Sequence, residues 1–102
     1  RVLFRSMVER YIIEKHMTPV LNGKSYYLSS NFNDIKNMIL QTVENPDRKC
    51  PHWDDRGKTV YFKKFPKVIG IHGMRRTYCK RMVVVVRNFN NEIITAYPTD
   101  NG

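Results

Sequence analysis

The chain has 102 residues, enough for one domain with a single modest hydrophobic core. Its 18 Lys and Arg outnumber nine Asp and Glu, which gives a net charge of +9 and favours partners with a negatively charged surface. No apolar run approaches the roughly 20 residues that span a bilayer, and no signal-peptide pattern opens the chain, so we expect no membrane association.

Two helices are predicted in the first half of the chain. Residues 3–17 carry apolar side chains at helical spacing, and Pro19 ends this helix because it pushes Thr18 out of the helical region. A second helix follows the candidate N-caps Ser29, Ser30 and Asn31 and ends at residues 45–46. The apolar stripe of the first helix is Phe4, Met7, Val8, Tyr11 and Ile12, and that of the second is Ile35, Met38, Ile39, Thr42 and Val43.

The remaining segments predict turns, a loop and strands. Residues 21–24 are typical of a turn, and residues 25–28 fit either a short strand or a loop. Residues 46–57 have no usable period and many turn formers, so we expect a long exposed loop. The predicted strands are 59–62, 68–71, 78–87 and 92–97, and residues 88–91 join the last two as a hairpin.

This order of elements predicts the fold class. Two helices followed by hairpin-connected strands are typical of an α+β fold, because an antiparallel sheet with helices on one face buries the apolar sides of both. We expect two N-terminal helices packed on a four- to five-stranded antiparallel sheet, all within one domain, residues 1–102.

Positive charge is concentrated in the second half of the chain. Residues 56–91 contain ten Lys and Arg and no Asp or Glu, whereas the rest of the chain is nearly neutral. The segment also holds the most strand-prone sequence, residues 82–86, so its strands offer a basic face or rim to a polyanion. Nucleic acid is favoured over a merely solvated surface. The expected nucleic-acid contacts are Lys63, Lys64, Lys67, Lys80, Arg81 and Arg87.

His16 is the first candidate for chemistry. It continues the spacing of Phe4, Val8 and Ile12 into the last turn of the first predicted helix, next to Lys15. The C-terminal end of a helix favours the protonated imidazole, which suits a histidine for proton transfer near neutral pH. The alternative is a core or capping histidine that hydrogen-bonds a carbonyl group, and the spacing alone favours this alternative.

The last predicted strand and the basic segment offer groups for phosphate. Thr95 and Tyr97 alternate with Ile94 and Ala96, so the hydroxyl pair shares one strand face and can bind a phosphate or stack a base. Thr and Tyr are also ordinary strand residues, and the pair alone does not distinguish a site from a sheet. The other candidates are Arg75 and Arg76 as phosphate clamps, whereas His52 and His72 are expected to be incidental.

The residue types exclude several reaction classes. There is no H-E-x-x-H sequence, no Cys/His cluster and no glycine-rich phosphate loop, and the acids are scattered, so we expect no metal and no cofactor. Cys50 and Cys79 are expected to be reduced and structural. Metal-free RNA cleavage remains, because it needs only a base for the ribose 2′-hydroxyl, an acid for the leaving oxygen and donors around the phosphorus. His16, Thr95, Tyr97 and the arginines meet that need.

The order of these features resembles the barnase–EndoU–colicin–RelE group of ribonucleases. Lys15-His16 on an early helix and Thr95-x-Tyr97 on a late strand are similar to the motifs of the colicin D-type tRNases. Residues 93–98, Ile-Ile-Thr-Ala-Tyr-Pro, resemble the final strand of bacterial EndoU-type toxin domains. The resemblance follows most of the chain in order and consists of short motifs.

The resemblance implies a metal-independent endoribonuclease toxin that cuts tRNA and leaves a 2′,3′-cyclic phosphate. It also implies the C-terminal domain of a bacteriocin or contact-dependent inhibition system, delivered into the cytoplasm of a competing cell, and a chain without an initial Met suits such a fragment. A cognate immunity protein would be acidic, because it would cover a basic cleft, and we expect a monomer apart from that complex. The implied roles are general base or acid for His16, phosphate contact for Lys15 and Thr95, orientation or stacking for Tyr97, and transition-state charge for Arg75 and Arg76.

Two other functions fit the sequence. A non-catalytic RNA- or DNA-binding module would use the same basic sheet to hold a nucleic-acid backbone. An immunity or antitoxin-like interaction protein is the third, although its charge has the wrong sign for masking a basic nuclease. Replacing His16 by Ala distinguishes the first two, because only a nuclease would lose turnover while keeping its RNA affinity.

Overall fold

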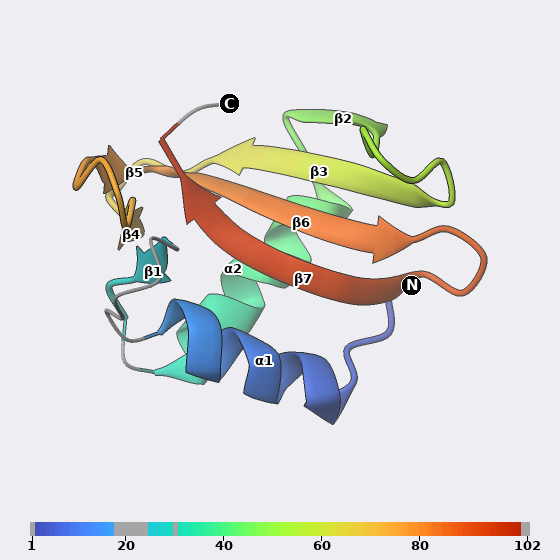
Figure 1. The fold of residues 1–102 in the computed structure, drawn as a ribbon, viewed down its shortest axis with the longest axis horizontal. Coiled ribbons are helices and arrows are strands. Elements are labelled where there is room, and N and C mark those ends of the chain that lie inside the picture. Colours follow the sequence, from blue (N-terminus) through green and yellow to red (C-terminus); the bar gives the residue numbers. More distant parts are fainter. Residues whose placement is uncertain (1, 18–24, 30, 101–102) are drawn as a thin grey trace.

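The computed structural model describes residues 2–17, 25–29 and 31–100. The fold is α+β, as the sequence predicts, and both helices pack against the same face of the larger sheet (Figure 1). The elements in chain order are α1 (Ser6–His16), β1 (Tyr26–Tyr27), α2 (Phe32–Glu44), β2 (Arg48–Pro51), β3 (Lys58–Lys64), β4 (Gly70–Ile71), β5 (Tyr78–Cys79), β6 (Arg81–Arg87) and β7 (Glu92–Thr99).

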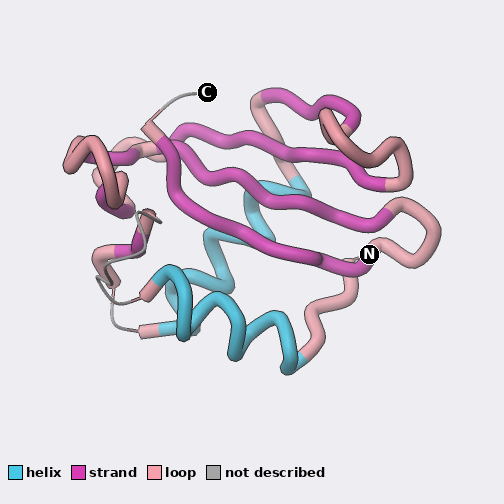
Figure 2. The backbone as a smooth tube through the Cα atoms, in the orientation of Figure 1, coloured by secondary structure: helices cyan, strands magenta, loops and turns pink. Residues whose placement is uncertain are grey.

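The strands form two antiparallel sheets instead of one. The large sheet has the order β2-β3-β6-β7, and the small sheet has the order β1-β4-β5. Figure 2 shows the small sheet at one end of the large one, beside the end of β7. The predicted strand 78–87 is therefore divided at Lys80, because β5 pairs with β4 while β6 pairs with β3 and β7.

The pairing also corrects the predicted loop 46–57 and the predicted strand 68–71. The predicted loop 46–57 is wrong in its first half, since β2 runs antiparallel to β3 with Arg48 opposite Phe62 and Pro51 opposite Thr59. Pairing with β3 makes this segment a strand, although its own sequence has no strand period. Of the predicted strand 68–71, only β4 is a strand.

The helices are close to their predicted positions. Asn31 is the N-cap of α2, and its side chain accepts a hydrogen bond from the Asn33 N–H at 2.9 Å. Ser30, the predicted turn 21–24 and the predicted helix end at residues 18–19 lie outside the described residues. In α1, Met7 is exposed although it was assigned to the apolar stripe, because the helix turns Ile12 and His16 toward the sheet.

The main core lies between the helices and the large sheet. Its fully buried side chains include Ile12, Ile35, Ile39, Met82, Val84, Ile93 and Ala96. A β-bulge follows Ile93, because Val86 lies opposite Ile93 while Val85 lies opposite Thr95. The bulge adds a residue and lets both Ile93 and Ala96 face the helices. The predicted shared face of Ile94 and Ala96 is therefore wrong, since Ile94 packs on the opposite side.

Thr95 and Tyr97 share the face of the large sheet that points away from the main core. Thr95 lies opposite Val85 and Tyr97 lies opposite Val83, and both valines belong to a second apolar cluster with Val60. This face is called the open face below. The predicted common face of Thr95 and Tyr97 is thus confirmed by the register.

Candidate functional site

His16, Thr95 and Tyr97 line one pocket, although they come from opposite ends of the chain. The pocket has a volume of about 260 Å³ and lies where the end of α1, the residue before β1 and strand β7 meet. It is called the His16 pocket here. Its described lining is Tyr11, His16, Ser25, Thr95 and Tyr97.

The buried His16 ring is oriented by its neighbours. Its Nδ1 lies 2.6 Å from the backbone oxygen of Ser25, and its ring stacks on Tyr97 with the centroids 5.9 Å apart. Tyr11 approaches edge-on at 6.1 Å. A carbonyl oxygen can only accept a hydrogen bond, so Nδ1 carries the proton and Nε2 is the basic nitrogen of the neutral ring. A hydrogen bond to a carbonyl group is the contact expected of a core histidine. The same hydrogen bond would also orient a general base.

The two hydroxyl groups of the pocket are suited to donate hydrogen bonds. Thr95 and Tyr97 are half-buried. Burial raises the pKa of Tyr97 above its ordinary value, so the phenol keeps its proton at neutral pH. Neutral donors at fixed positions stabilise charge that develops on a substrate oxygen.

The predicted catalytic cations lie elsewhere. Lys15 is exposed on α1. The Arg75 guanidinium donates from Nε and Nη2 to the Asp100 carboxylate at 3.1 and 2.5 Å, and Thr77 donates to the same carboxylate. These hydrogen bonds, of which the one from Arg75 has the largest effect, hold the pKa of Asp100 well below its usual range. Arg76 is exposed between β4 and β5 with a φ of 58°. The charge of Arg75 is thus shared with Asp100, and the described lining of the His16 pocket contains none of these three cations.

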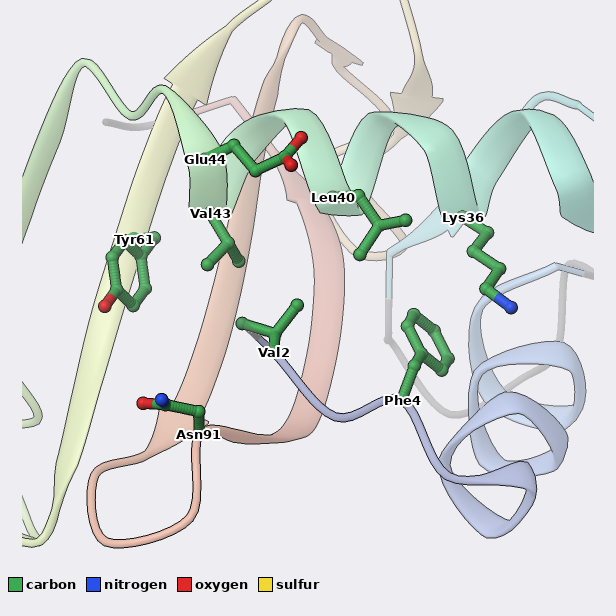
Figure 3. A pocket seen from close by; sticks show the side chains of 8 residues that line it. All are labelled: Val2, Phe4, Lys36, Leu40, Val43, Glu44, Tyr61 and Asn91. Carbon is green, nitrogen blue, oxygen red and sulfur yellow. The ribbon is translucent and has the colours of Figure 1, made fainter.

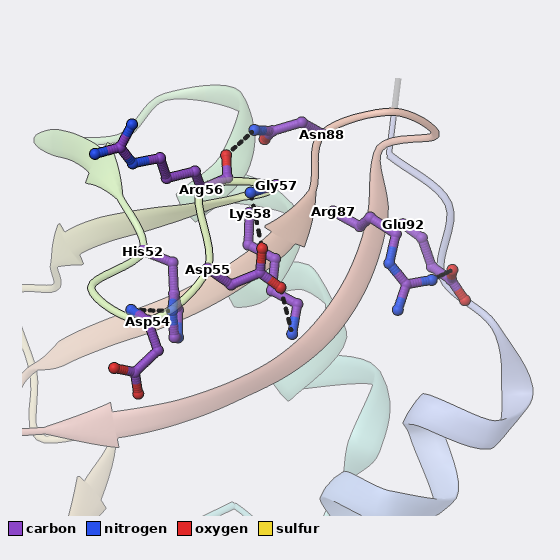
Figure 4. Close-up of polar contacts among 9 residues, drawn as sticks. All are labelled: His52, Asp54, Asp55, Arg56, Gly57, Lys58, Arg87, Asn88 and Glu92. Carbon is purple, nitrogen blue, oxygen red and sulfur yellow. Dashed lines mark hydrogen bonds and ion pairs between the residues drawn. The ribbon is translucent and has the colours of Figure 1, made fainter.

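The predicted nucleic-acid contacts divide among three places. Lys63, Lys64 and Arg81 contribute to a pocket of about 180 Å³, called the basic pocket, whose described lining also includes Asp47, Arg48 and Phe62. At the other end of the sheet, Arg87 donates to Glu92 at 3.0 Å (Figure 4). Lys67 and Lys80 are exposed in connections between strands. Of the predicted contacts, Lys63, Lys64 and Arg81 therefore gather in one pocket and the other three do not.

The other two histidines form local turn contacts. In the loop after β2, Nδ1 of His52 accepts a hydrogen bond from the Asp54 N–H at 3.1 Å, as Figure 4 shows, and the ring stacks on Trp53. Nδ1 of His72 accepts from the Arg75 N–H at 3.1 Å. Neither belongs to the described lining of the His16 pocket.

Cysteine and metal chemistry find little support among the described residues. No three His, Cys, Asp or Glu side chains within residues 2–17, 25–29 and 31–100 gather as a metal site would require. Cys50 and Cys79 are free thiols on β2 and β5. Burial raises the pKa of Cys79 to about 11, so this thiol is not ionised at neutral pH. No described helix combines the length and apolarity that a bilayer crossing needs.

A larger pocket offers less chemistry. It has a volume of about 620 Å³ and lies between the N-terminal segment, α2 and β3 (Figure 3). Its lining combines apolar side chains, among them Val2, Leu40 and Val43, with the polar Lys36, Glu44 and Asn91. The Lys36 ammonium at its rim lies 3.9 Å from the Glu9 carboxylate, which partly neutralises it. Volume alone therefore does not identify the site, since His16 lies in a smaller pocket and His52 lines another pocket of about 630 Å³.

In the described lining of the His16 pocket and the basic pocket, the residues that were not predicted are Tyr11, Ser25, Asp47, Arg48 and Phe62. Tyr11 was assigned to the apolar stripe of the helix, and Ser25 contributes a backbone oxygen, which no side-chain pattern reveals. Arg48 fell within the predicted loop. Phe62 lies in a predicted strand. The alternation of side chains along that strand was the one signal that could have shown that Phe62 and the core-facing Tyr61 lie on opposite faces of the sheet.

Comparison with known proteins leaves the site to be interpreted from its own chemistry. No protein-family model, no curated protein and no solved structure matches the chain at a significant level.

Proposed function

We propose that the protein is a metal-independent endoribonuclease. The observation that supports this function is the His16 pocket, in which an imidazole anchored on the Ser25 carbonyl meets the hydroxyl groups of Thr95 and Tyr97. A fixed proton acceptor beside two neutral donors is the set of groups that cleavage of a ribose phosphodiester uses. The net charge of +9 supports a nucleic-acid substrate.

The geometry suggests how the residues would act. Nε2 of His16 takes the proton of the ribose 2′-hydroxyl, and that oxygen attacks the neighbouring phosphorus. The bond to the 5′-oxygen breaks, the leaving oxygen takes up a proton from solvent water, and a 2′,3′-cyclic phosphate remains. Thr95 and Tyr97 donate to the non-bridging oxygens, and Lys15 adds positive charge beside His16. In the converse arrangement His16 supplies the proton to the leaving oxygen.

The substrate and the biological role are proposed from the resemblance to colicin D-type and EndoU-type toxins. On this basis tRNA is the first substrate to test, and the activity serves competition between bacteria. An acidic immunity protein would inhibit the enzyme by covering its basic surface.

The decisive experiment compares four proteins on total tRNA in EDTA. Wild type and His52→Ala, which changes a histidine outside the pocket, should give discrete fragments that end in cyclic phosphate. His16→Ala and His16→Gln should cut at least about 100-fold more slowly, because loss of a general acid or base typically costs two to four orders of magnitude. Circular dichroism establishes that each variant is folded, and gel electrophoresis with end-group analysis measures the cleavage.

Two outcomes would oppose the proposal. A folded His16→Gln protein that cuts as fast as wild type would remove His16 from the chemistry. If wild type shifts tRNA on a native gel without cutting it, in buffer and in cell extract, the protein is a non-catalytic RNA-binding module.

A further inference from the structure

The open face of the large sheet carries a row of side chains that begins at the His16 pocket, in which Val83 is buried and the partly exposed Phe62 and Tyr97 pack against its cluster. Tyr97 lies opposite Val83, Val83 opposite Phe62, and Phe62 opposite Arg48. The row thus crosses all four strands from β7 to β2. Its β7 end stacks on His16, with the ring centroids of His16 and Tyr97 5.9 Å apart.

The far end of this row is the basic pocket. The guanidinium carbon of Arg48 lies 4.4 Å from the centroid of the Phe62 ring, which holds the planar cation over an aromatic face. By register, Lys64 and Arg81 lie opposite each other and share the open face with Phe62. Lys63 belongs to the opposite face, where its ammonium donates to the Asn45 carbonyl at 3.0 Å. Three cations therefore surround the open side of the pocket.

These three cations differ from Arg75 and Arg87. Arg75 and Arg87 form ion pairs with Asp100 and Glu92. Within the part of the chain that the structure describes, no carboxylate forms an ion pair with Arg48, Lys64 or Arg81. The one acid of the basic pocket, Asp47, accepts the backbone N–H of Lys64 at 2.7 Å. The basic pocket is thus a local excess of positive charge that a ligand anion can neutralise.

We propose that the basic pocket is a phosphate-binding subsite for single-stranded RNA that lies along the row from the His16 pocket. This inference rests on the proposed ribonuclease function. Neighbouring strands are about 4.8 Å apart, so the three spacings from β7 to β2 place the subsite about 14 Å from Tyr97, a distance that a few nucleotides span. Arg48 and Arg81 can each bind a phosphate through paired hydrogen bonds. Single-stranded RNA is favoured over an acidic protein because the row carries the aromatic rings of Tyr97 and Phe62, on which bases stack, and ends at the cations of the basic pocket.

If the basic pocket binds a phosphate, variants of this pocket should bind an RNA more weakly only when the RNA is long enough to reach it. The test measures the affinity of folded His16→Ala protein, which does not consume the RNA, for a fluorescent dinucleotide and a fluorescent octanucleotide. Adding Arg48→Gln and Arg81→Gln should weaken octanucleotide binding at least about tenfold and leave dinucleotide binding unchanged, because only the longer RNA reaches the basic pocket. The plot of log affinity against log salt should also lose about 0.7 in slope for each phosphate contact removed.

The matched control removes two exposed arginines elsewhere, by Arg10→Gln and Arg56→Gln. It has the same net charge as the double variant of the basic pocket, so an equal loss of octanucleotide affinity in both would overturn the subsite and leave only general attraction. Lys64→Gln alone is the second variant and should show a smaller loss in the same direction. The subsite would also be overturned if the double variant of the basic pocket and Lys64→Gln both bound the octanucleotide as tightly as the protein without these changes.

The two experiments together distinguish failure of the subsite from failure of the proposed nuclease function. If wild type cuts no RNA but the length-dependent loss is observed, the subsite stands and the catalytic function fails. If wild type cuts RNA and the arginine variants of the basic pocket keep the octanucleotide KM, the catalytic function stands and the subsite fails. Binding of polyglutamate at this face without binding of RNA would assign it to an acidic protein instead.

Discussion

The hydrogen bond from His16 Nδ1 to the Ser25 carbonyl ties the candidate site to a backbone position and not to a second side chain. This anchor fixes which ring nitrogen carries the proton, a property that in many sites depends on a carboxylate. The stack of His16 on Tyr97 then sets the angle of the ring. At the scale of single residues, the same contacts satisfy a buried histidine and would orient it for proton transfer in the proposed enzyme.

Asp100 is the residue with the clearest expected pH response. Its ionised carboxylate accepts hydrogen bonds from Arg75 and Thr77, which lower its pKa from the ordinary value of 3.8. A lowered carboxyl pKa stabilises the fold above that ordinary value, and the stabilisation is lost progressively as the pH falls below it. Asp100→Asn should therefore melt at a lower temperature than wild type at neutral pH, and the difference should shrink below about pH 4.

Thermal unfolding followed by circular dichroism at several pH values measures this effect. Asp54→Asn is the control, because it removes the same charge from an exposed loop residue. If Asp54→Asn showed the same pH dependence of the melting temperature, the ion pair of Arg75 with Asp100 would not be the cause of that dependence.

Helix α1 is short and depends on its attachments. Eleven residues form a marginal helix in isolation, so contacts with the sheet supply most of its stability. Before the helix, the Leu3 N–H donates to the Asn91 carbonyl at 2.8 Å and the Ile93 N–H donates to the Leu3 carbonyl at 2.9 Å. At its end, His16 is bound to Ser25. This element therefore carries the histidine and is fixed to the sheet at both ends.

Two neighbouring isoleucines test how α1 is held. Ile12 is fully buried in the main core, whereas 43% of Ile13 is exposed. Ile12→Ala should lower the free energy of unfolding by about 2–5 kcal/mol, because it leaves a cavity in the core. Ile13→Ala should change it by no more than about 0.5 kcal/mol. Urea unfolding measures both, and equal losses would show that α1 does not pack in this orientation.

In the whole molecule, the small sheet closes the end of the large one and brings Ser25 to His16. The buried Tyr27 hydroxyl donates to the Met82 sulfur at 3.1 Å, which links β1 to β6. Gly70 of β4 lies where the two sheets meet. A Cβ atom there would lie 2.5 Å from both the Pro98 side chain and the Tyr26 carbonyl oxygen, too close for any side chain. The arrangement of the sheets therefore requires glycine at this position.

Gly70→Ala should disturb the His16 pocket from a distance. The added methyl group pushes against backbone and a proline ring, and overpacking of this kind typically costs about 1–3 kcal/mol. We expect a lower free energy of unfolding and slower RNA cleavage, because the shift of β1 moves the Ser25 carbonyl. Met74→Ala, which changes an exposed side chain in the connection after β4, should have little effect on either quantity. Wild-type stability and cleavage in Gly70→Ala would show that the sheets do not meet as described.

Much of the fold follows from local pattern. The stripe of Ile35, Met38 and Ile39 predicted α2, and the valines of β6 predicted a buried strand, because side-chain periodicity reports which face of an element is apolar. Asn31 was among the predicted caps for the same local reason. The candidate residues His16, Thr95 and Tyr97 were also singled out by spacing and residue type, although these alone favoured a core histidine and did not distinguish the Thr95 and Tyr97 pair from ordinary strand residues.

The tertiary structure decided how these pieces meet. Strand β2 exists because it pairs with β3, the division at Lys80 arises because β5 and β6 have different partners, and the bulge after Ile93 depends on the register with β6. The Ser25 anchor of His16 and the basic pocket also join segments far apart in the chain. The sequence by itself thus determined the helices, the core strands and the chemical groups. Only long-range pairing decided which groups share a pocket, because hydrogen bonds between distant segments leave no local period.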